Sequence, residues 1–212
     1  MFPVFSKIQY DFEKVRAAYQ KMVKAISLVT FPMMLGLFAI AQEFVNVVFG
    51  SKWEPVIMLL RIFCFCGMFQ SIGTTVGNIL LSQGRGDLQL KLQILGTAVV
   101  IVSILVGLRW GINGVAFCYT LQAVAWTHFI LYITNRLIRA DHIRFYYQLT
   151  NSYLIGFIVL LILLLSKLLL IKQDWFNLIG FVFVGFAATL IMLAFTKEIK
   201  LENKTLLIKV MQ

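Results

Sequence analysis

The chain has 212 residues, 60% of them hydrophobic, with three cysteines and a formal net charge of +10. Soluble domains are roughly 45–50% apolar, and three cysteines provide no disulfide framework. The basic excess lies in short segments between long uncharged ones, which argues against a nucleic-acid partner. Composition and charge placement therefore exclude an ordinary soluble domain and favour a membrane protein.

Six stretches of the sequence contain no Asp, Glu, Lys or Arg. They are 25–42, 62–84, 92–108, 110–135, 145–166 and 175–196, of 18, 23, 17, 26, 22 and 22 residues. A helix needs roughly 20 apolar residues to cross about 30 Å of hydrocarbon, whereas a water-soluble helix needs a polar face. The sequence therefore predicts an all-α, polytopic transmembrane helical bundle with six spans.

The basic residues are divided unequally between the two sides of such a bundle. If the N-terminus is cytoplasmic, cytoplasmic segments hold 14 of the 19 Lys and Arg residues and the other side holds 5. Because cytoplasmic loops of membrane proteins carry the excess of Lys and Arg, this distribution predicts that both termini are cytoplasmic.

Residues 1–24 are predicted to form a cytoplasmic amphipathic helix, with Ser6 and Gln9 as a capping box. Its apolar stripe consists of Ile8, Phe12, Val15, Tyr19, Met22 and Ile26. These residues recur at steps of three or four, and the opposite face is basic. Such a helix can lie among the headgroups of the inner leaflet or pack against another helix of the same protein. The sequence leaves both options open.

Residues 25–135 are predicted to form a four-span helical bundle that carries most of the intramembrane polar residues. The four spans are expected at about 25–42, 56–82, 88–108 and 110–135. Pro32 lies inside the first span and removes a backbone hydrogen bond there. The return from Arg109 to Gly114 is very short, so the third and fourth spans should form a close antiparallel hairpin.

The remainder of the chain is predicted to differ in character. A basic, aromatic cytoplasmic loop at 136–149 precedes an accessory two-span hairpin at 150–196, and 197–212 forms a cytoplasmic tail. Few polar residues interrupt these two spans, and helices that are apolar all round face lipid on most sides.

The second span carries a polar stripe. Its members are Gln70, Ser71, Thr74, Thr75, Asn78 and Ser82. They fall within about 140° of arc at the helical angle of 100° per residue. Gly73 and Gly77 form a GxxxG pair that allows close helix approach. The stripe either lines a water-filled cavity or makes hydrogen bonds between helices.

Two cations lie near the ends of spans, where charge is costly without water or a partner. Arg61 near the outer end of the second span can bind phosphate as a bidentate donor, extend to the interface, or pair with Glu54. Lys91 at the inner end of the third span has the same alternatives. The candidate substrate-lining residues are Arg61, Gln70, Thr74, Asn78 and Lys91.

The sequence contains no Ser/His/Asp arrangement, metal-ligand cluster or phosphate-binding loop. No catalytic residue, metal or cofactor is therefore expected, and the protein is predicted not to be an enzyme. Cys64 and Cys66 point about 200° apart on a helix and are expected to be packing residues. One alternative is an enzyme acting on lipid phosphate. Its charged cluster would be Arg136, Arg139, Asp141, His142 and Arg144.

An ordered set of short motifs resembles a known family. They are Phe2 to Asp11 with Tyr19, Phe31-Pro32 with Gly36-Leu37, Phe49 to Pro55, Leu80 to Asp87, and Gly111 to Ala116. Each motif alone is weak, but their order and spacing over about 1–135 resemble Wzx-type oligosaccharide flippases. These belong to the multidrug/oligosaccharidyl-lipid/polysaccharide exporter superfamily.

The resemblance implies a partial exporter-superfamily fold. That family typically has two six-helix lobes, often followed by two extra helices, and this chain would match the last four spans and the extra pair. The implied function is flipping of a polyprenyl-diphosphate-linked oligosaccharide in the bacterial inner membrane, for cell-surface polysaccharide or lipopolysaccharide biosynthesis. The implied partners are that lipid-linked oligosaccharide, membrane lipids, and a polysaccharide polymerase or glycosyltransferases.

Two alternative functions remain open at this stage. A multidrug exporter of the same superfamily would favour an acidic lining, and no carboxylate lies deep in any span; Glu43 comes closest. A non-transporting membrane subunit of a polysaccharide-assembly complex is the other alternative.

Overall fold

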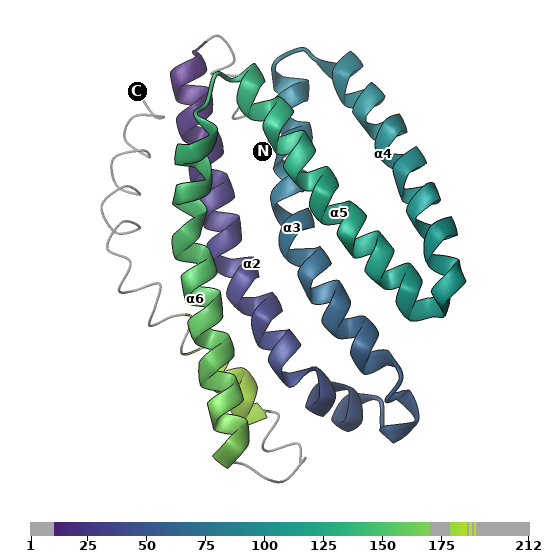
Figure 1. The fold of residues 1–212 in the computed structure, drawn as a ribbon. Helices are drawn as coiled ribbons and strands as arrows, with labels where there is room; N and C mark the ends of the chain where they lie inside the picture. The colour runs from purple at the N-terminus through teal and green to yellow at the C-terminus, as the bar shows by residue number, and fades with distance from the viewer. Residues whose placement is uncertain (1–10, 170–178, 186, 188, 190–212) are drawn as a thin grey trace.

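The computed structural model describes residues 11–169, 179–185, 187 and 189 of the chain, and these form long helices without strands (Figure 1). The elements are α2 (Phe12–Val48), η1 (Ser51–Trp53), α3 (Val56–Ser82), α4 (Gly86–Gly107), η2 (Leu108–Trp110), α5 (Gly111–Leu137) and α6 (His142–Leu169). The two η elements are single 3₁₀ turns. The all-α class predicted from the sequence is therefore confirmed.

Four helical segments among the described residues are long and apolar enough to cross a membrane. They are Phe12–Val48, Val56–Ser82, Gly86–Leu137 and Phe145–Lys167. The third segment contains both α4 and α5, which fold back on each other (Figure 1). The chain is thus a multi-pass membrane protein.

The helices pack in a spatial order that differs from their order in the chain. The extensive contacts are α6 with α2, α2 with α3, α3 with α5, and α5 with α4. The α3–α4 and α5–α6 connections lie at one end of the bundle, and the α2–α3 and α4–α5 connections point the other way (Figure 1). Consecutive helices are therefore antiparallel, and α2 and α6 are parallel neighbours.

Helix α2 begins one residue after Asp11, whose side chain accepts hydrogen bonds from the backbone N–H groups of Glu13 and Lys14, both at 3.1 Å. The Lys14 N–H holds the pKa of the Asp11 carboxyl below its usual value. The helix then continues through residues 24 and 25, where the sequence predicted a boundary between an amphipathic helix and the first span. No Gly or Pro interrupts it there. The predicted cap at Ser6 lies outside the described residues.

The apolar stripe of α2 packs inside the protein. Val15 and Tyr19 are fully buried, and the Tyr19 ring stacks on Phe145 of α6 with their centroids 5.5 Å apart. The sequence left two options for this stripe, the lipid headgroups or another helix. In its described part, the stripe packs against another helix.

Helix α6 begins at His142, eight residues before the predicted start of the fifth span. The connection from α5 is a short turn that includes Arg139 with φ +54°. Phe145 and Leu149 are buried in the same core as Tyr19. Burial of these side chains explains why this basic, aromatic segment is helical where the sequence predicted a loop.

The hairpin between α4 and α5 is closed by glycines. A Cβ on Gly107 would lie 2.6 Å from the Cα of Val115, and a Cβ on Gly114 would lie 2.7 Å from the carbonyl oxygen of Gly107. Gly111 has φ +71°, which favours glycine. The close antiparallel hairpin expected from the sequence is therefore present.

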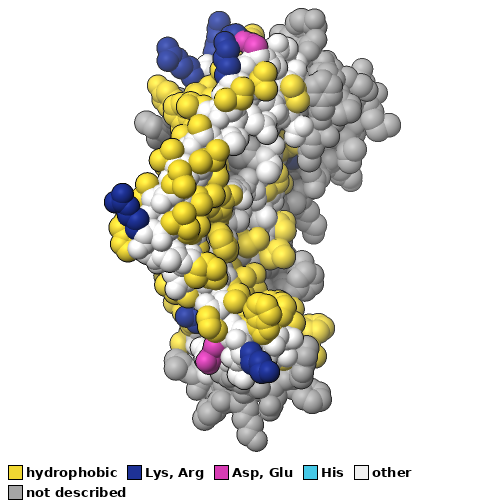
Figure 2. Space-filling view, turned by 90° about the vertical axis from the view of Figure 1, so that its right-hand side faces the viewer, with side chains coloured by type: hydrophobic (Ala, Val, Ile, Leu, Met, Phe, Trp, Pro, Cys, Tyr) yellow, Lys and Arg dark blue, Asp and Glu magenta, His cyan; other side chains and the backbone are white. Residues whose placement is uncertain are grey.

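Burial is concentrated on one side of the bundle. The main core draws its side chains from α2, α3, α5 and α6, whereas α4 contributes only Gly96 and Gly107 to the buried set. Figure 2, which faces the α4 side of the bundle, shows hydrophobic side chains over much of that face, with Lys and Arg at its top, bottom and left edge. An exposed apolar belt between charged margins is what a bilayer requires.

The predicted sixth span and the tail at 197–212 lie largely outside the described residues. Phe181 is buried with Ala39 and Ile40 of α2 and with Val159 and Leu163 of α6. The count of six spans and the division into a lobe and an accessory hairpin stay predictions.

Candidate substrate-lining site

The structure divides the polar stripe of α3 into two parts. Thr75 and Ser82 are buried, and each hydroxyl donates to a carbonyl of its own helix, Ile72 at 2.7 Å and Ile79 at 2.8 Å. The Ser71 hydroxyl lies 3.2 Å from that of Thr30 on α2. These members of the stripe serve helix packing, as one of the two interpretations expected.

The other part of the stripe faces outward. Gln70 and Thr74 are exposed and Asn78 is half-buried. The Gln70 Nε2 donates to the Tyr119 hydroxyl of α5 over 2.9 Å, and the Thr74 hydroxyl donates to the Ser71 carbonyl over 2.8 Å. Three of the five candidate lining residues therefore share one accessible face in the middle and C-terminal half of α3.

The GxxxG pair brings two different helices close to α3. A Cβ on Gly73 would lie 3.4 Å from Ile130 of α5, and a Cβ on Gly77 would lie 3.0 Å from the Gln89 amide of α4. The two glycines therefore allow two different helices to pack closely on α3: α5 at Gly73 and the first turn of α4 at Gly77.

Arg61 lies on a different side of α3 from these residues. Its guanidinium is 5.9 Å from the centroid of the Phe38 ring on α2, and its Nε is buried without a hydrogen-bond partner. Within the part of the chain that the structure describes, Arg61 forms no ion pair with Glu54. A cation–π contact partly offsets the cost of the half-buried charge.

Lys91 is exposed on α4 and is not brought next to the α3 residues. Gln89, two residues before Lys91, reaches Gly77 of α3. The structure therefore assembles Gln70, Thr74 and Asn78, and it leaves Arg61 and Lys91 apart from them.

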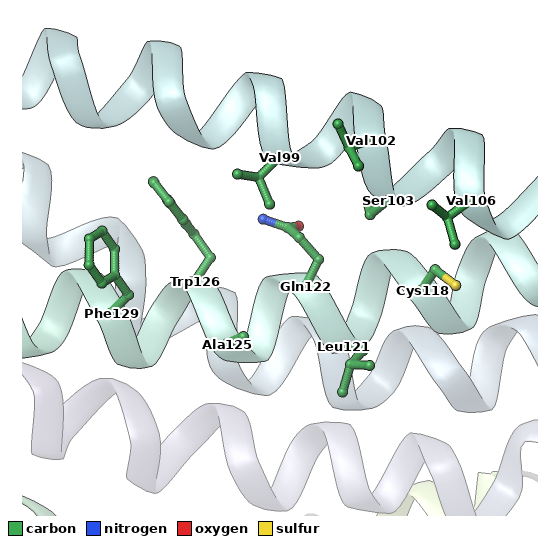
Figure 3. Close-up of a pocket in the computed structure, with 10 residues that line it drawn as sticks. All are labelled: Val99, Val102, Ser103, Val106, Cys118, Leu121, Gln122, Ala125, Trp126 and Phe129. Atoms are coloured by element: carbon green, nitrogen blue, oxygen red, sulfur yellow. The ribbon is translucent and has the colours of Figure 1, made fainter.

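The sequence places Tyr119, Gln122 and Trp126 on one helical face, but the structure separates their environments. Tyr119 meets α3, whereas Gln122 and Trp126 point toward α4 and line a groove with Val99 and Val102 (Figure 3). The groove has a volume of about 440 Å³ and an almost wholly apolar lining. The link between Gln70 and Tyr119 could not be found in the sequence, since helical periodicity does not reveal which helices meet.

A second contact missed in the sequence joins α2 to α6. Lys167 Nζ lies 2.8 Å from the Glu43 Oε1 and also donates to the Ala39 carbonyl over 2.8 Å. Glu43 is 8% exposed, so this is a largely buried ion pair. The sequence predicted only that both residues lie at the outer side.

The structure describes only some side chains of the charged cluster that an enzyme acting on lipid phosphate would use. The Arg139 guanidinium lies 5.7 Å from the Phe12 ring centroid, and Arg136 is exposed. The side chains of His142 and Arg144 lie outside the described set, so the cluster stays a sequence-based alternative.

Comparisons with known proteins relate the chain to polysaccharide biosynthesis. Residues 1–58 match the family described as "Polysaccharide biosynthesis protein". The chain is 36% identical over 107 residues to the lipopolysaccharide biosynthesis protein WzxC of Escherichia coli K12, which covers 50% of the chain and 22% of WzxC. It is 28% identical over 137 residues to the teichuronic acid biosynthesis protein TuaB of Bacillus subtilis 168, covering 65% and 27%.

A solved structure shares the fold. The inward closed conformation of the lipid II flippase MurJ matches 92% of this chain and 42% of that chain, with a TM-score of 0.71 and 19% identity. The chain therefore spans less than half of that structure and about a quarter of the length of the two curated relatives above.

Proposed function

Since this chain is related to the Wzx-type polysaccharide biosynthesis proteins of the exporter superfamily, we propose that it is part of a flippase for a polyprenyl-diphosphate-linked oligosaccharide. The flippase moves its ligand from the inner to the outer leaflet and leaves it chemically unchanged. The chain supplies the last four spans of the second lobe and the two helices that follow.

One observation carries this proposal more than any other. The sequence similarity to WzxC covers half of the chain, and the similarity to the MurJ fold covers nearly all of it. The sequence similarity and the fold similarity thus agree, since one protein acts in lipopolysaccharide biosynthesis and the other is a lipid II flippase. Exporter lobes of this kind work by alternating access around a central site.

The orientation that we propose places both termini in the cytoplasm of a bacterium, with the helices in its inner membrane. The exposed face of α3 then lines the central site, where Gln70, Thr74 and Asn78 offer hydrogen bonds to sugar. Arg61 and Lys91 lie apart from this face, and each supplies positive charge for the diphosphate nearer one of the two interfaces. A polysaccharide polymerase or glycosyltransferases act before or after the flippase.

The test of the function uses the complete protein that contains this chain. Deleting its gene should stop export of surface polysaccharide and leave lipid-linked oligosaccharide in the inner leaflet, and the gene supplied on a plasmid should restore both. If the deletion leaves the lipid-linked oligosaccharide evenly distributed between leaflets, the proposed function is wrong.

The lining is tested by cysteine accessibility in a protein without native cysteines. Single cysteines at positions 70, 74 and 78 should react with a water-soluble thiol reagent in intact membranes. A cysteine at position 76 is the matched control, because Val76 is 3% exposed on the opposite side of the helix. Equal reaction at all four positions would contradict a hydrated face.

The role of Arg61 is tested with two variants. Arg61→Ala should reduce export while membrane abundance stays near normal, and Arg61→Lys should keep part of the activity because it keeps the charge but loses the planar fork. A parallel loss of abundance and activity would instead assign Arg61 to packing against Phe38.

Orientation is tested by reporter fusions after residues 50 and 111, which should both report the outer side. A cytoplasmic signal at residue 111 would reverse the α4–α5 hairpin and overturn the proposed orientation.

A further inference from the structure

Gln70 and Tyr119 form a polar contact between two helices at an accessible position. The Gln70 Nε2 donates to the Tyr119 hydroxyl over 2.9 Å. The Phe63 ring lies about two turns before Gln70 on α3. It meets the Tyr119 ring edge-on, with centroids 6.3 Å apart. Gln70 is exposed, and 44% of the Phe63 surface is exposed. An amide, a phenol and an open aromatic ring therefore share one patch.

The Gln70–Tyr119 bond uses only part of the hydrogen-bonding capacity of the two groups. It occupies one N–H of the amide and one lone pair of the phenol. The Gln70 carbonyl oxygen, its second N–H and the Tyr119 O–H have no other partner among the described residues. Gln70 is close to the middle of α3, at the depth of hydrocarbon, where unpaired polar groups cost several kcal/mol (~2–7 kcal/mol). These groups are therefore available to a polar occupant that displaces water from this face.

The free groups restrict the chemistry of that occupant. A donor and an acceptor stand side by side, next to an apolar ring. Lipid tails have no hydrogen-bonding groups. A phosphate offers acceptors alone, and the cation that would attract it, Arg61, is turned toward Phe38 on α2. A sugar ring has vicinal hydroxyls that donate and accept, together with an apolar C–H face that packs on an aromatic ring.

We propose that Phe63, Gln70 and Tyr119 form a saccharide-binding subsite that holds one sugar of the transported glycan. One hydroxyl donates to the Gln70 carbonyl oxygen, its neighbour accepts from the Tyr119 O–H, and the C–H face covers Phe63. This inference rests on the proposed flippase function and assigns a specificity role to Tyr119 and Phe63.

The experiment measures ligand binding by the full-length protein in nanodiscs. The two probes are undecaprenyl diphosphate without sugar and the same lipid carrying the oligosaccharide of the source strain. Tyr119→Phe keeps the ring and removes only the hydroxyl, so it should weaken binding of the sugar-bearing lipid roughly fivefold to tenfold, the equivalent of one hydrogen bond. Binding of the sugar-free lipid should not change.

The control variant is Phe117→Leu, which alters an exposed ring on another side of α5 and should change neither affinity. Equal weakening of both lipids by Tyr119→Phe, or no change in either, would overturn the subsite. Cross-linking of a cysteine at position 119 to a helix of the complete protein other than those of this chain would also overturn it, because the face would then be an internal interface. Failure of the wild type to bind either lipid would instead reject the proposed function itself.

Discussion

The α2–α6 pair and the α4–α5 pair are held together by different kinds of contact. Helices α2 and α6 are far apart in sequence, and their contact includes the Ser27–Ser152 hydrogen bond at 2.8 Å and the Glu43–Lys167 ion pair at 2.8 Å. Helices α4 and α5 are consecutive, and their contact is mostly apolar, with Ser103 and Gln122 as polar side chains and a close backbone approach at Gly107.

The difference follows from whether a short turn already joins the two helices of a pair. A tight turn holds α4 and α5 together, so their side chains need only fit, and an apolar groove can remain between them (Figure 3). No turn joins α2 to α6. Since hydrocarbon is as apolar as the helix surfaces, small residues and polar pairs must provide the attraction. Four substitutions test this comparison.

The largest effect is expected at the hairpin. Gly107→Ala places a methyl group 2.6 Å from the Val115 Cα, a backbone atom that cannot move independently. The substitution should destabilise the protein by about 3 kcal/mol, measured by reversible unfolding in detergent micelles. Gly86→Ala is the control, because its Cβ would meet only Leu81 at an ordinary 3.8 Å. Similar stability of the two variants would contradict the importance of the backbone approach.

Next in size is the ion pair. Glu43→Ala leaves the Lys167 ammonium largely buried without its counter-charge, which should cost about 2 kcal/mol of unfolding free energy. The double variant Glu43→Ala with Lys167→Ala should recover part of the loss. Strict additivity of the two single effects in a double-mutant cycle would mean that the two residues do not interact.

The serine contact should have a smaller effect. Ser27→Ala removes a buried hydrogen bond to Ser152 and should cost about 0.6 kcal/mol, a typical value between membrane helices. Ser103→Ala on α4 is the control, since that hydroxyl bonds only to the Val100 carbonyl of its own helix. An equal loss of unfolding free energy in both variants would mean that the Ser27–Ser152 hydrogen bond does not distinguish the α2–α6 pair from the α4–α5 pair.

The smallest effect is expected in the groove. The Gln122 amide makes no hydrogen bond to the described residues, so Gln122→Leu should change the unfolding free energy by less than about 0.5 kcal/mol. A loss comparable with that of Glu43→Ala would show that the α4–α5 pair also depends on a polar contact, and the comparison would fail.

Sequence reasoning predicted α3 with the limits that the structure gives, Val56–Ser82, because Pro55 precedes it and the Gly84 turn follows. It did not predict the single long α2 or the early start of α6. In both cases apolar residues such as Tyr19 and Phe145 find each other only in three dimensions, 126 positions apart in the chain. Periodicity shows which face of a helix is apolar, but it does not identify the partner helix.

The candidate site shows the same limit. The α3 stripe was visible as a 140° arc, yet the sequence could not separate Ser71 and Thr75, which serve packing, from Gln70 and Thr74, which stay accessible. That separation depends on where α2 and α5 dock. For the same reason Tyr119 was recognised as polar and intramembrane but not as the partner of Gln70.

The unbroken length of α2 has a mechanical consequence. At 37 residues it is a rod of about 55 Å, far longer than the roughly 30 Å of hydrocarbon that it crosses. Its N-terminal turns contact the start of α6 through Tyr19 and Phe145, and its C-terminal end contacts the same helix through Glu43 and Lys167. Two parallel rods joined at both ends resist shear. A force applied to the N-terminal end of α2 is therefore carried through the membrane as tilt of the pair, with Pro32 as the point where α2 can bend.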